Sequence, residues 1–212
     1  MDRIKRIDIP SNMDIDNIEG TAEWYIARNS TYDVYGALEC INNSEEYSGD
    51  EVYLIHYPDG KTYMPFEKNK NICITNPIWN NGVFYIMKID LINRICFIYE
   101  YIPKKNCLNL KNRINIGDKD ECYNLNLKGM PLSVIEEDGE NFKIIWPENK
   151  NIVIGCNESF LFRNKDELYF ERWYDDISIK EETVVRNIKT CEIVKVIDGR
   201  LFIMPNNVIW QL

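Results

Sequence analysis

The chain has 212 residues, of which 45% are hydrophobic and 28% are charged, and its formal net charge is −9. This length and composition are those of a folded globular chain with one or two domains, and they exclude a largely disordered protein. The excess of acidic residues also argues against nucleic acid or an anionic membrane as a partner, because both select clustered lysine and arginine.

The seven cysteines are odd in number and widely spaced, and no C-x-x-C pair occurs among them. We therefore expect reduced thiols, no metal site and no cofactor. The first ten residues contain no apolar block, so we expect neither a secretory signal nor a membrane span. Both features predict a cytoplasmic protein.

Residues 1–20 are polar and alternate aspartate with isoleucine, which predicts an N-terminal arm or an edge strand. The rest of the chain, 21–212, is expected to form a single all-β domain. Its first element is a strand over Thr21–Arg28. The stretch Tyr32–Cys40 is rich in tyrosine and valine and is also predicted to be a strand.

The next segments are the clearest hairpins of the chain. Val52–Tyr57 and Lys61–Phe66 flank a Pro-Asp-Gly turn, and Gly82–Asp90 is expected to pair with Arg94–Ile102, which ends at Pro103. Residues 104–128 are more polar and predict short strands with an exposed loop at 117–120.

From Leu132 to Trp210 short strands alternate with polar turns, including a hairpin over 158–174 that turns at Asn164-Lys165-Asp166. This layout predicts an all-β fold in the form of a small β-propeller or a propeller-like array of antiparallel hairpins, with an antiparallel β-sandwich as the alternative. Cysteines spaced by 33 to 35 residues hint at a repeat of that length, although coincidence explains them equally well.

The single histidine, His56, limits the available chemistry. Any Ser-His or Cys-His catalytic pair has to use it, and so does any histidine-containing zinc site. It lies in a predicted strand with Val52 and Leu54 on its face. The simpler interpretation is a half-buried histidine with a satisfied ring nitrogen, and a functional role is the alternative.

A second candidate site lies near the end of the 158–174 hairpin. Strand alternation predicts Tyr169, Glu171 and Trp173 on one face, just before Asp175 and Asp176. Aromatic rings beside carboxylates suit a sugar ligand, and a glycoside hydrolase needs two carboxyl groups around the bond that it cleaves. A plain row of core aromatics is the alternative interpretation.

Aromatic residues also suit contact surfaces, because they cover a large area at a small cost in conformational entropy. Trp24, Trp79 and Trp210 are candidates, and Trp79, between a proline and two asparagines, is the one most expected at the surface. Core packing is the alternative for each of them.

No phosphate-binding loop, dinucleotide fingerprint or nucleophile elbow occurs in the sequence, and no catalytic residue is assigned. The leading hypothesis is a non-enzymatic binding module that presents loops and aromatic residues to a protein partner. The alternative is a carbohydrate-binding protein or a glycoside hydrolase. A structural protein of a particle or coat is a third possibility, without a specific sequence feature in its favour.

Overall fold

The computed structural model assigns 54% of the chain to strands and 7% to helices, which confirms the all-β prediction. The chain separates into two compact units, unit 1 (1–123) and unit 2 (124–212). A single domain over 21–212 therefore stays a prediction. The described residues are 5–29, 33–117, 124–129, 131–174, 181–205 and 208–212.

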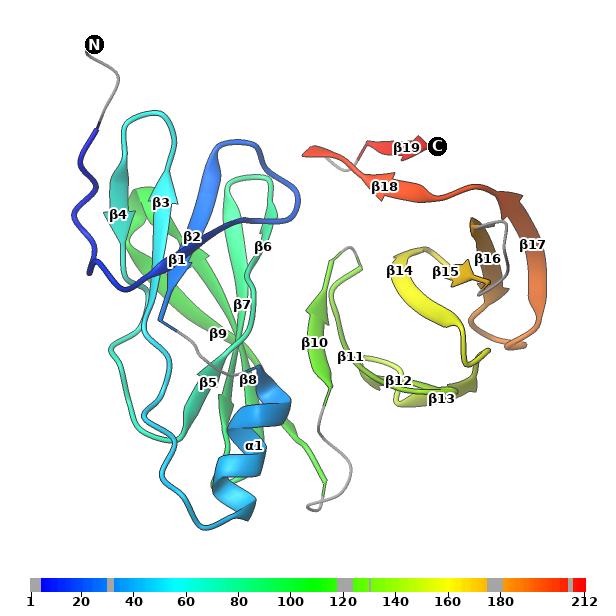
Figure 1. Cartoon of the computed structure of the whole chain (residues 1–212), viewed down its shortest axis with the longest axis horizontal. Coiled ribbons are helices and arrows are strands. Elements are labelled where there is room, and N and C mark those ends of the chain that lie inside the picture. Colours follow the sequence, from blue (N-terminus) through cyan, green and yellow to red (C-terminus); the bar gives the residue numbers. More distant parts are fainter. Residues whose placement is uncertain (1–4, 30–32, 118–123, 130, 175–180, 206–207) are drawn as a thin grey trace. The chain divides into compact units, whose positions relative to one another are not determined.

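Unit 1 contains two antiparallel sheets (Figure 1). The first has the order β1 (Asp14–Asn17), β2 (Trp24–Arg28), β3 (Val52–His56) and β4 (Lys61–Tyr63). The second has the order β5 (Ile72–Ile74), β7 (Val83–Asp90), β8 (Ile95–Ile102) and β9 (Cys107–Asn115), and β6 (Ile78–Asn80) also pairs with β7. A short 3-10 helix, η1 (Pro103–Lys105), follows β8, so the predicted central hairpin and its end at Pro103 are confirmed.

The predicted strand over Tyr32–Cys40 is wrong, because this stretch contains the helix α1 (Val34–Asn42). Asp33 caps its first turn by accepting a hydrogen bond from the backbone N–H of Gly36 at 2.8 Å. Val34, Ala37 and Leu38 are buried, and their spacing of three and four residues places them on one helix face. The cap and this spacing outweigh the strand preference of tyrosine and valine.

The two sheets of unit 1 share a core in which Trp24 contacts Trp79, Phe84 and Tyr63. A buried acid, Asp50, joins the segment before β3 to β5 of the other sheet. Its carboxyl group accepts from the backbone N–H of Ile74 at 2.5 Å and from the hydroxyl of Tyr47. Both donors are neutral.

Unit 2 contains two four-stranded antiparallel sheets and a terminal hairpin, each joining strands in chain order. The first sheet comprises β10 (Leu125–Lys128), β11 (Ser133–Asp138), β12 (Asn141–Trp146) and β13 (Lys150–Val153). The second comprises β14 (Glu158–Asn164), β15 (Glu167–Trp173), β16 (Glu181–Asn187) and β17 (Ile193–Asp198). The hairpin consists of β18 (Leu201–Ile203) and β19 (Ile209–Gln211).

Successive small antiparallel sheets of this kind confirm the prediction of a propeller-like array of hairpins. The core of unit 2 lies between its two four-stranded sheets, where Phe142, Phe160 and Phe170 contact one another with ring centroids 4.7–5.5 Å apart. Phe160 and Phe170 are direct cross-strand partners, so one face of the second sheet is fixed against the first.

The cysteine spacing does not mark equivalent positions of a repeat. Cys40 lies in α1, Cys73 in β5 and Cys107 at the start of β9. The six described cysteines are free thiols, as predicted, and Cys122 lies outside the described residues.

Candidate functional site

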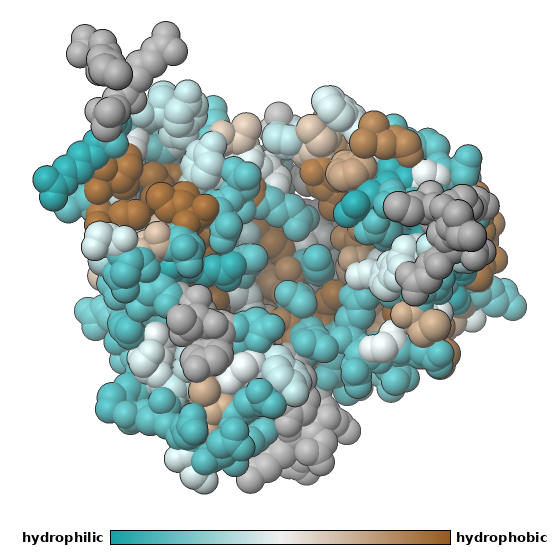
Figure 2. Space-filling view, viewed as in Figure 1, coloured by the Kyte–Doolittle hydropathy of each residue, from teal (hydrophilic) through white to brown (hydrophobic). Residues whose placement is uncertain are grey.

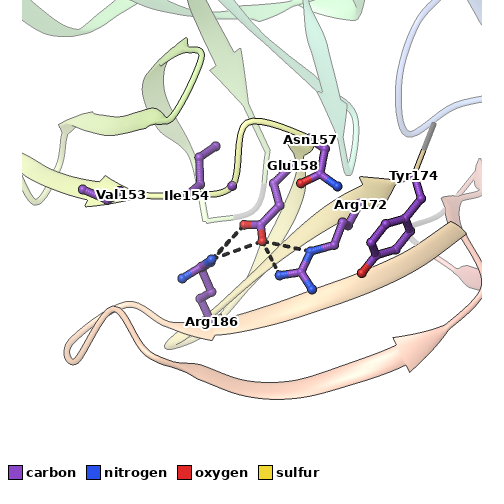
Figure 3. Close-up of a pocket in the computed structure, with 8 residues that line it drawn as sticks. Val153, Ile154, Asn157, Glu158, Arg172, Tyr174 and Arg186 are labelled. Carbon is purple, nitrogen blue, oxygen red and sulfur yellow. Dashed lines mark hydrogen bonds and ion pairs between the residues drawn. The ribbon is translucent and has the colours of Figure 1, made fainter. Parts of the chain in front are cut away.

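A pocket of about 470 Å³ opens beside the second sheet of unit 2 (Figure 3). Residues 153–155, at the end of β13 and just after it, line one part of it. Glu158, the first residue of β14, and Asn157 before it line another part. Arg172 of β15, Tyr174 just after β15 and Arg186 of β16 complete the lining. The pocket is therefore built from four consecutive segments of one unit.

The guanidinium groups of Arg172 and Arg186 both point to the carboxylate of Glu158, as Figure 3 shows. Arg172 donates to Oε1 from Nε at 3.1 Å and from Nη2 at 2.5 Å. Arg186 donates from Nε to Oε2 at 3.1 Å and from Nη2 to Oε1 at 3.1 Å. Both oxygens of Glu158 are thus occupied by charged donors, which is the strong form of hydrogen bond.

A second acid, Glu182, borders the same cluster. Its Oε2 lies 3.8 Å from Nη1 of Arg172 and accepts a hydrogen bond from the Tyr174 hydroxyl at 3.0 Å. Burial disfavours the charged form of Arg172, but its hydrogen bonds with Glu158 and Tyr174 outweigh burial and raise the pKa of this guanidinium. The cation is therefore firmly retained.

Strand pairing explains why these charges meet. Glu158 lies directly opposite Arg172 on the neighbouring strand, and Arg172 lies directly opposite Glu182 on the next one. Direct cross-strand partners face the same side of a sheet, and opposite charges in such positions attract one another. The 158–174 hairpin was predicted, and Glu158 and Arg172 are each seven residues from Lys165 in its turn. A register shift between Phe160 and Phe162 brings this pair together, so counting outward from the Asn164–Glu167 pair at the turn would not have found it. Arg186 comes from the third strand.

The residues predicted from strand alternation lie on the opposite face of β15. Tyr169, Glu171 and Trp173 alternate with Leu168 and Phe170, which are fully buried in the core. Trp173 is 40% exposed. Asp175 and Asp176 lie outside the described residues.

Two of these side chains are engaged within the fold. Oε1 of Glu171 forms an ion pair with Nε of Arg200 at 2.9 Å. The ring of Tyr169 stacks on Phe162 with centroids 4.4 Å apart, and its hydroxyl donates to Glu167 at 2.8 Å. Burial, followed by this hydrogen bond, raises the pKa of Tyr169. Of the three, Trp173 offers the most open surface.

His56 lies at the end of β3 in unit 1. Its Nδ1 is 2.7 Å from Oδ1 of Asp59, and its ring centroid is 4.7 Å from that of Trp24. The hydrogen bond with His56, followed by that from the backbone N–H of Lys61, lowers the pKa of Asp59 to about 2. The half-exposed ring also lines a separate pocket of about 540 Å³ with Tyr25 and Tyr57.

The three tryptophans considered as contact residues differ in environment. Trp24 is buried in the core of unit 1. Trp79, expected at the surface, is half-buried and contacts Trp24 and Phe84. Trp210, in the terminal hairpin of unit 2, is 57% exposed. Local sequence around Trp79 did not reveal that β6 would carry its ring onto the core.

Sequence reasoning also missed a concentration of exposed apolar side chains near the C-terminus. These side chains lie on β17 and in the terminal hairpin, and we call them together the C-terminal apolar surface: Ile193, Val194, Val196, Val208, Ile209, Trp210 and Leu212. The run Glu192–Ile197 was predicted only as one of the short strands between Leu132 and Trp210. Four apolar residues around a single lysine, Lys195, were the available signal.

No protein-family model and no curated protein matches this chain. Within the described ranges, no group of three or more histidine, cysteine, aspartate or glutamate side chains is arranged to hold a metal ion. The helices found there also lack the length and apolar content needed to cross a membrane.

Proposed function

We propose that this chain is a non-enzymatic binding module whose partner is a protein. One observation carries the proposal: of the 17 large hydrophobic side chains that are exposed among the described residues, seven belong to the C-terminal apolar surface. That surface comes from only the last 20 residues. Concentrated exposed apolar groups are typical of protein contact sites.

The outer strand of the second sheet in unit 2 supports this proposal. In the described part of β17 the strand pairs only with β16, and Ile193, Val194 and Val196 are exposed. The outer strand of the second sheet in unit 1, β9, exposes Leu108 and Leu110 but also carries Asn109, Lys111, Asn112 and Arg113. Charged and polar residues protect a strand edge from association, and β17 has fewer of them, Lys195 and Asp198.

The terminal hairpin is held at its base, which gives its apolar residues a defined position. Arg200 and Leu212 exchange two backbone hydrogen bonds, and Nε2 of Gln211 donates to the backbone carbonyl of Asp198 at 2.8 Å. Figure 2 shows hydrophobic side chains gathered over this hairpin. A rigid aromatic anchor such as Trp210 suits the centre of a contact.

The proposal also includes a cytoplasmic location and a partner that is neither nucleic acid nor a membrane. Free cysteines support a cytoplasmic location. The net charge of −9 supports a partner other than nucleic acid or an anionic membrane.

The test is cross-linking of the tagged full chain in extracts of its source cells, followed by mass spectrometry. The wild-type chain is compared with Trp210→Ala and with the double variant Val194→Asp, Val196→Asp. We expect a protein cross-linked to residues 193–212 in the wild type and its recovery reduced at least about tenfold in both variants, because apolar anchors dominate such contacts.

Leu110→Asp is the matched control, since Leu110 is an exposed apolar residue of the outer strand β9 in unit 1. It should leave recovery unchanged. Equal recovery with all three variants, or cross-links confined to other parts of the chain, would refute the proposed surface.

Carbohydrate binding is the second candidate, and the exposed ring of Trp173 favours it because sugars stack on aromatic faces. The engagement of Glu171 by Arg200 weighs against hydrolysis at that residue. Titration of the chain with neutral oligosaccharides, followed by NMR, tests this candidate. We expect the oligosaccharides to shift NMR signals of the chain, and we expect Trp173→Ala but not Trp210→Ala to abolish these shifts. If no signal shifts, carbohydrate binding is refuted.

A further inference from the structure

The pocket beside His56 in unit 1 lies on the face of the first sheet that is turned away from the core. Tyr25 of β2 and Ile55 of β3 line it and are direct cross-strand partners, and they alternate with the core residues Trp24 and Leu54. Side chains that alternate along a strand point to opposite faces of its sheet. The volume of about 540 Å³ lies within the range of small-molecule sites, which is roughly 300–1,000 Å³.

The turn between β3 and β4 forms one side of this pocket, and its backbone is fixed by hydrogen bonds. The backbone N–H of Tyr57 donates to the carbonyl of Glu23 at 2.7 Å, which extends the pairing of β2 and β3 by one residue. The backbone N–H of Gly60 donates to the carbonyl of His56 at 2.7 Å and closes the turn. Tyr57 and Pro58 therefore line the pocket from a defined position.

The N-terminal arm forms another side of the pocket through Lys5 and Ile7. A Cβ atom placed on Gly60 would lie 2.6 Å from Cδ1 of Ile7 and 3.1 Å from Cε of Lys5. The Lys5 ammonium group donates to the backbone carbonyls of Pro58 and Asp59. The arm is therefore held against the turn, and the Lys5 ammonium already has acceptors within the fold.

Apolar and aromatic side chains dominate the pocket lining. It includes the aliphatic side chains of Ile7 and Ile55, the ring of Pro58, and two tyrosines, Tyr25 and Tyr57. Tyr57 is 60% exposed, so its ring is open to a ligand. The lining offers few polar groups, and a ligand hydroxyl that loses its water without gaining a new hydrogen bond weakens binding.

The two tyrosines of the pocket are not engaged elsewhere in the fold. Within the ranges that the structure describes, neither Tyr25 nor Tyr57 takes part in a hydrogen bond through its hydroxyl or in a contact between rings. The hydroxyl of Tyr53, another tyrosine of β3, instead donates to Glu51 at 2.8 Å. The rings and hydroxyls of Tyr25 and Tyr57 are therefore available to a ligand.

We propose that this pocket binds a small, uncharged, planar aromatic molecule that carries a hydroxyl group. The ligand's ring lies against the rings of Tyr25 and Tyr57 and against the side chains of Ile7 and Ile55, and its hydroxyl forms a hydrogen bond with a tyrosine hydroxyl. The pocket belongs to unit 1, so the proposal does not depend on the C-terminal apolar surface of unit 2 or on its protein partner.

The lining favours this chemistry over a charged molecule or a sugar. A flat ring packs on aromatic side chains in offset-stacked or edge-to-face contacts, which add to the effect of burying its area. An anion gains little from Lys5, whose ammonium already donates to two carbonyls, and a cation is repelled by it. A sugar brings more hydroxyl groups than the lining can satisfy.

The experiment titrates the full-length chain with phenol, cyclohexanol, benzoate and D-glucose at constant ionic strength and follows binding by NMR. The reporters are the backbone amide signals of residues 55–60 and the ring signals of His56, which identify themselves because the chain has one histidine. Phenol should shift these signals and saturate. Cyclohexanol is similar in size but not planar, so its dissociation constant should be at least about threefold higher. Benzoate and D-glucose should also bind more weakly than phenol.

The decisive variant is Tyr57→Ala. Tyr57 is exposed, and its side chain has no partner in the described part of the chain, so the substitution is compatible with folding. We expect the dissociation constant for phenol to rise at least about fivefold, because one aromatic wall is lost. Tyr57→Phe keeps the ring and should stay within about threefold of the wild type.

Tyr35→Ala is the matched control. It makes the same substitution at a 43% exposed tyrosine of the same unit that does not line the pocket, and phenol binding should stay within about twofold of the wild type. The proposal is overturned if phenol shifts none of the reporter signals, if Tyr57→Ala leaves its binding unchanged or Tyr57→Phe weakens it equally, or if cyclohexanol, benzoate or D-glucose binds as tightly as phenol. None of these variants alters residues 193–212, so failure of this proposal is distinguishable from failure of the protein-contact proposal.

Discussion

Each unit of this protein buries an acidic side chain, but the two acids are satisfied by different chemistry. In unit 1, Asp50 accepts from a backbone N–H and a tyrosine hydroxyl, which are neutral donors that join two sheets. In unit 2, Glu158 accepts from two guanidinium groups at the base of a pocket. The first arrangement joins two sheets, whereas the second holds two cations that remain partly exposed to solvent.

Removing the acid from the ionic cluster should have the largest effect. Glu158→Ala leaves two guanidinium groups partly buried without their counterion, and we expect a loss of about 3–5 kcal/mol in the free energy of unfolding. Urea denaturation followed by fluorescence measures it. The quadruple variant Glu158→Met, Arg172→Met, Arg186→Met, Glu182→Gln should recover much of the loss, because apolar groups can replace an ion cluster and the glutamine keeps an acceptor for the Tyr174 hydroxyl. A loss below about 1 kcal/mol for Glu158→Ala would contradict the ionic account.

Removing Asp50 should lower the free energy of unfolding by less than removing Glu158, because an unpaired neutral donor is less costly to bury than an unpaired ion. For Asp50→Ala we expect about 2–3 kcal/mol, as the Ile74 N–H and the Tyr47 hydroxyl lose their acceptor. Asp50→Asn keeps one acceptor oxygen and should lose less. The same urea experiment applies, and the comparison between the units fails if Asp50→Ala proves more damaging than Glu158→Ala.

Two cysteines allow a further comparison between the buried surroundings of Asp50 in unit 1 and the exposed surface of unit 2. Burial, followed by the charge of Asp50, raises the pKa of the Cys73 thiol well above its usual value, while Cys156 is exposed. An alkylating reagent at pH 8 should label Cys156 at least about a hundredfold faster than Cys73, which needs local opening to react. Mass spectrometry of the labelled peptides gives both rates. Equal labelling rates would mean that the buried region around Asp50 and Cys73 opens readily.

The smallest effect concerns a third acid, Asp59, which is exposed and pairs with His56. Its pKa of about 2 lies below the ordinary value of 3.8, so the stability gained from its ionised form is complete above the ordinary value and is lost as the pH falls through about 2. His56→Ala should raise the pKa of Asp59 toward 3.8, as measured by carbon-detected NMR titration. The pKa of Asp166, lowered chiefly by its hydrogen bond with Lys189, should stay in place. A value for Asp59 that remains near 2 in the variant would show that the histidine is not the cause.

The candidate sites were only partly accessible from the sequence. Alternation correctly placed Tyr169, Glu171 and Trp173 on one face of β15, because the side-chain period of a strand is fixed by its backbone. It did not show that Arg200 would form an ion pair with Glu171, since Arg200 comes from a separate part of the chain. The helix α1 was missed because its cap at Asp33 and its short apolar stripe are weaker signals than a run of tyrosine and valine.

The alternation of short apolar runs with Pro, Gly, Asn and Asp turns determined by itself that this protein is built from consecutive antiparallel hairpins. Those signals are local, because a turn fixes which residues of its two flanking strands meet. The meeting of Glu158 with Arg186, the burial of Trp24 and Asp50, and the exposure of Trp210 were decided only in the tertiary structure. Each depends on contacts between elements that are distant in the chain, and no local pattern specifies such contacts.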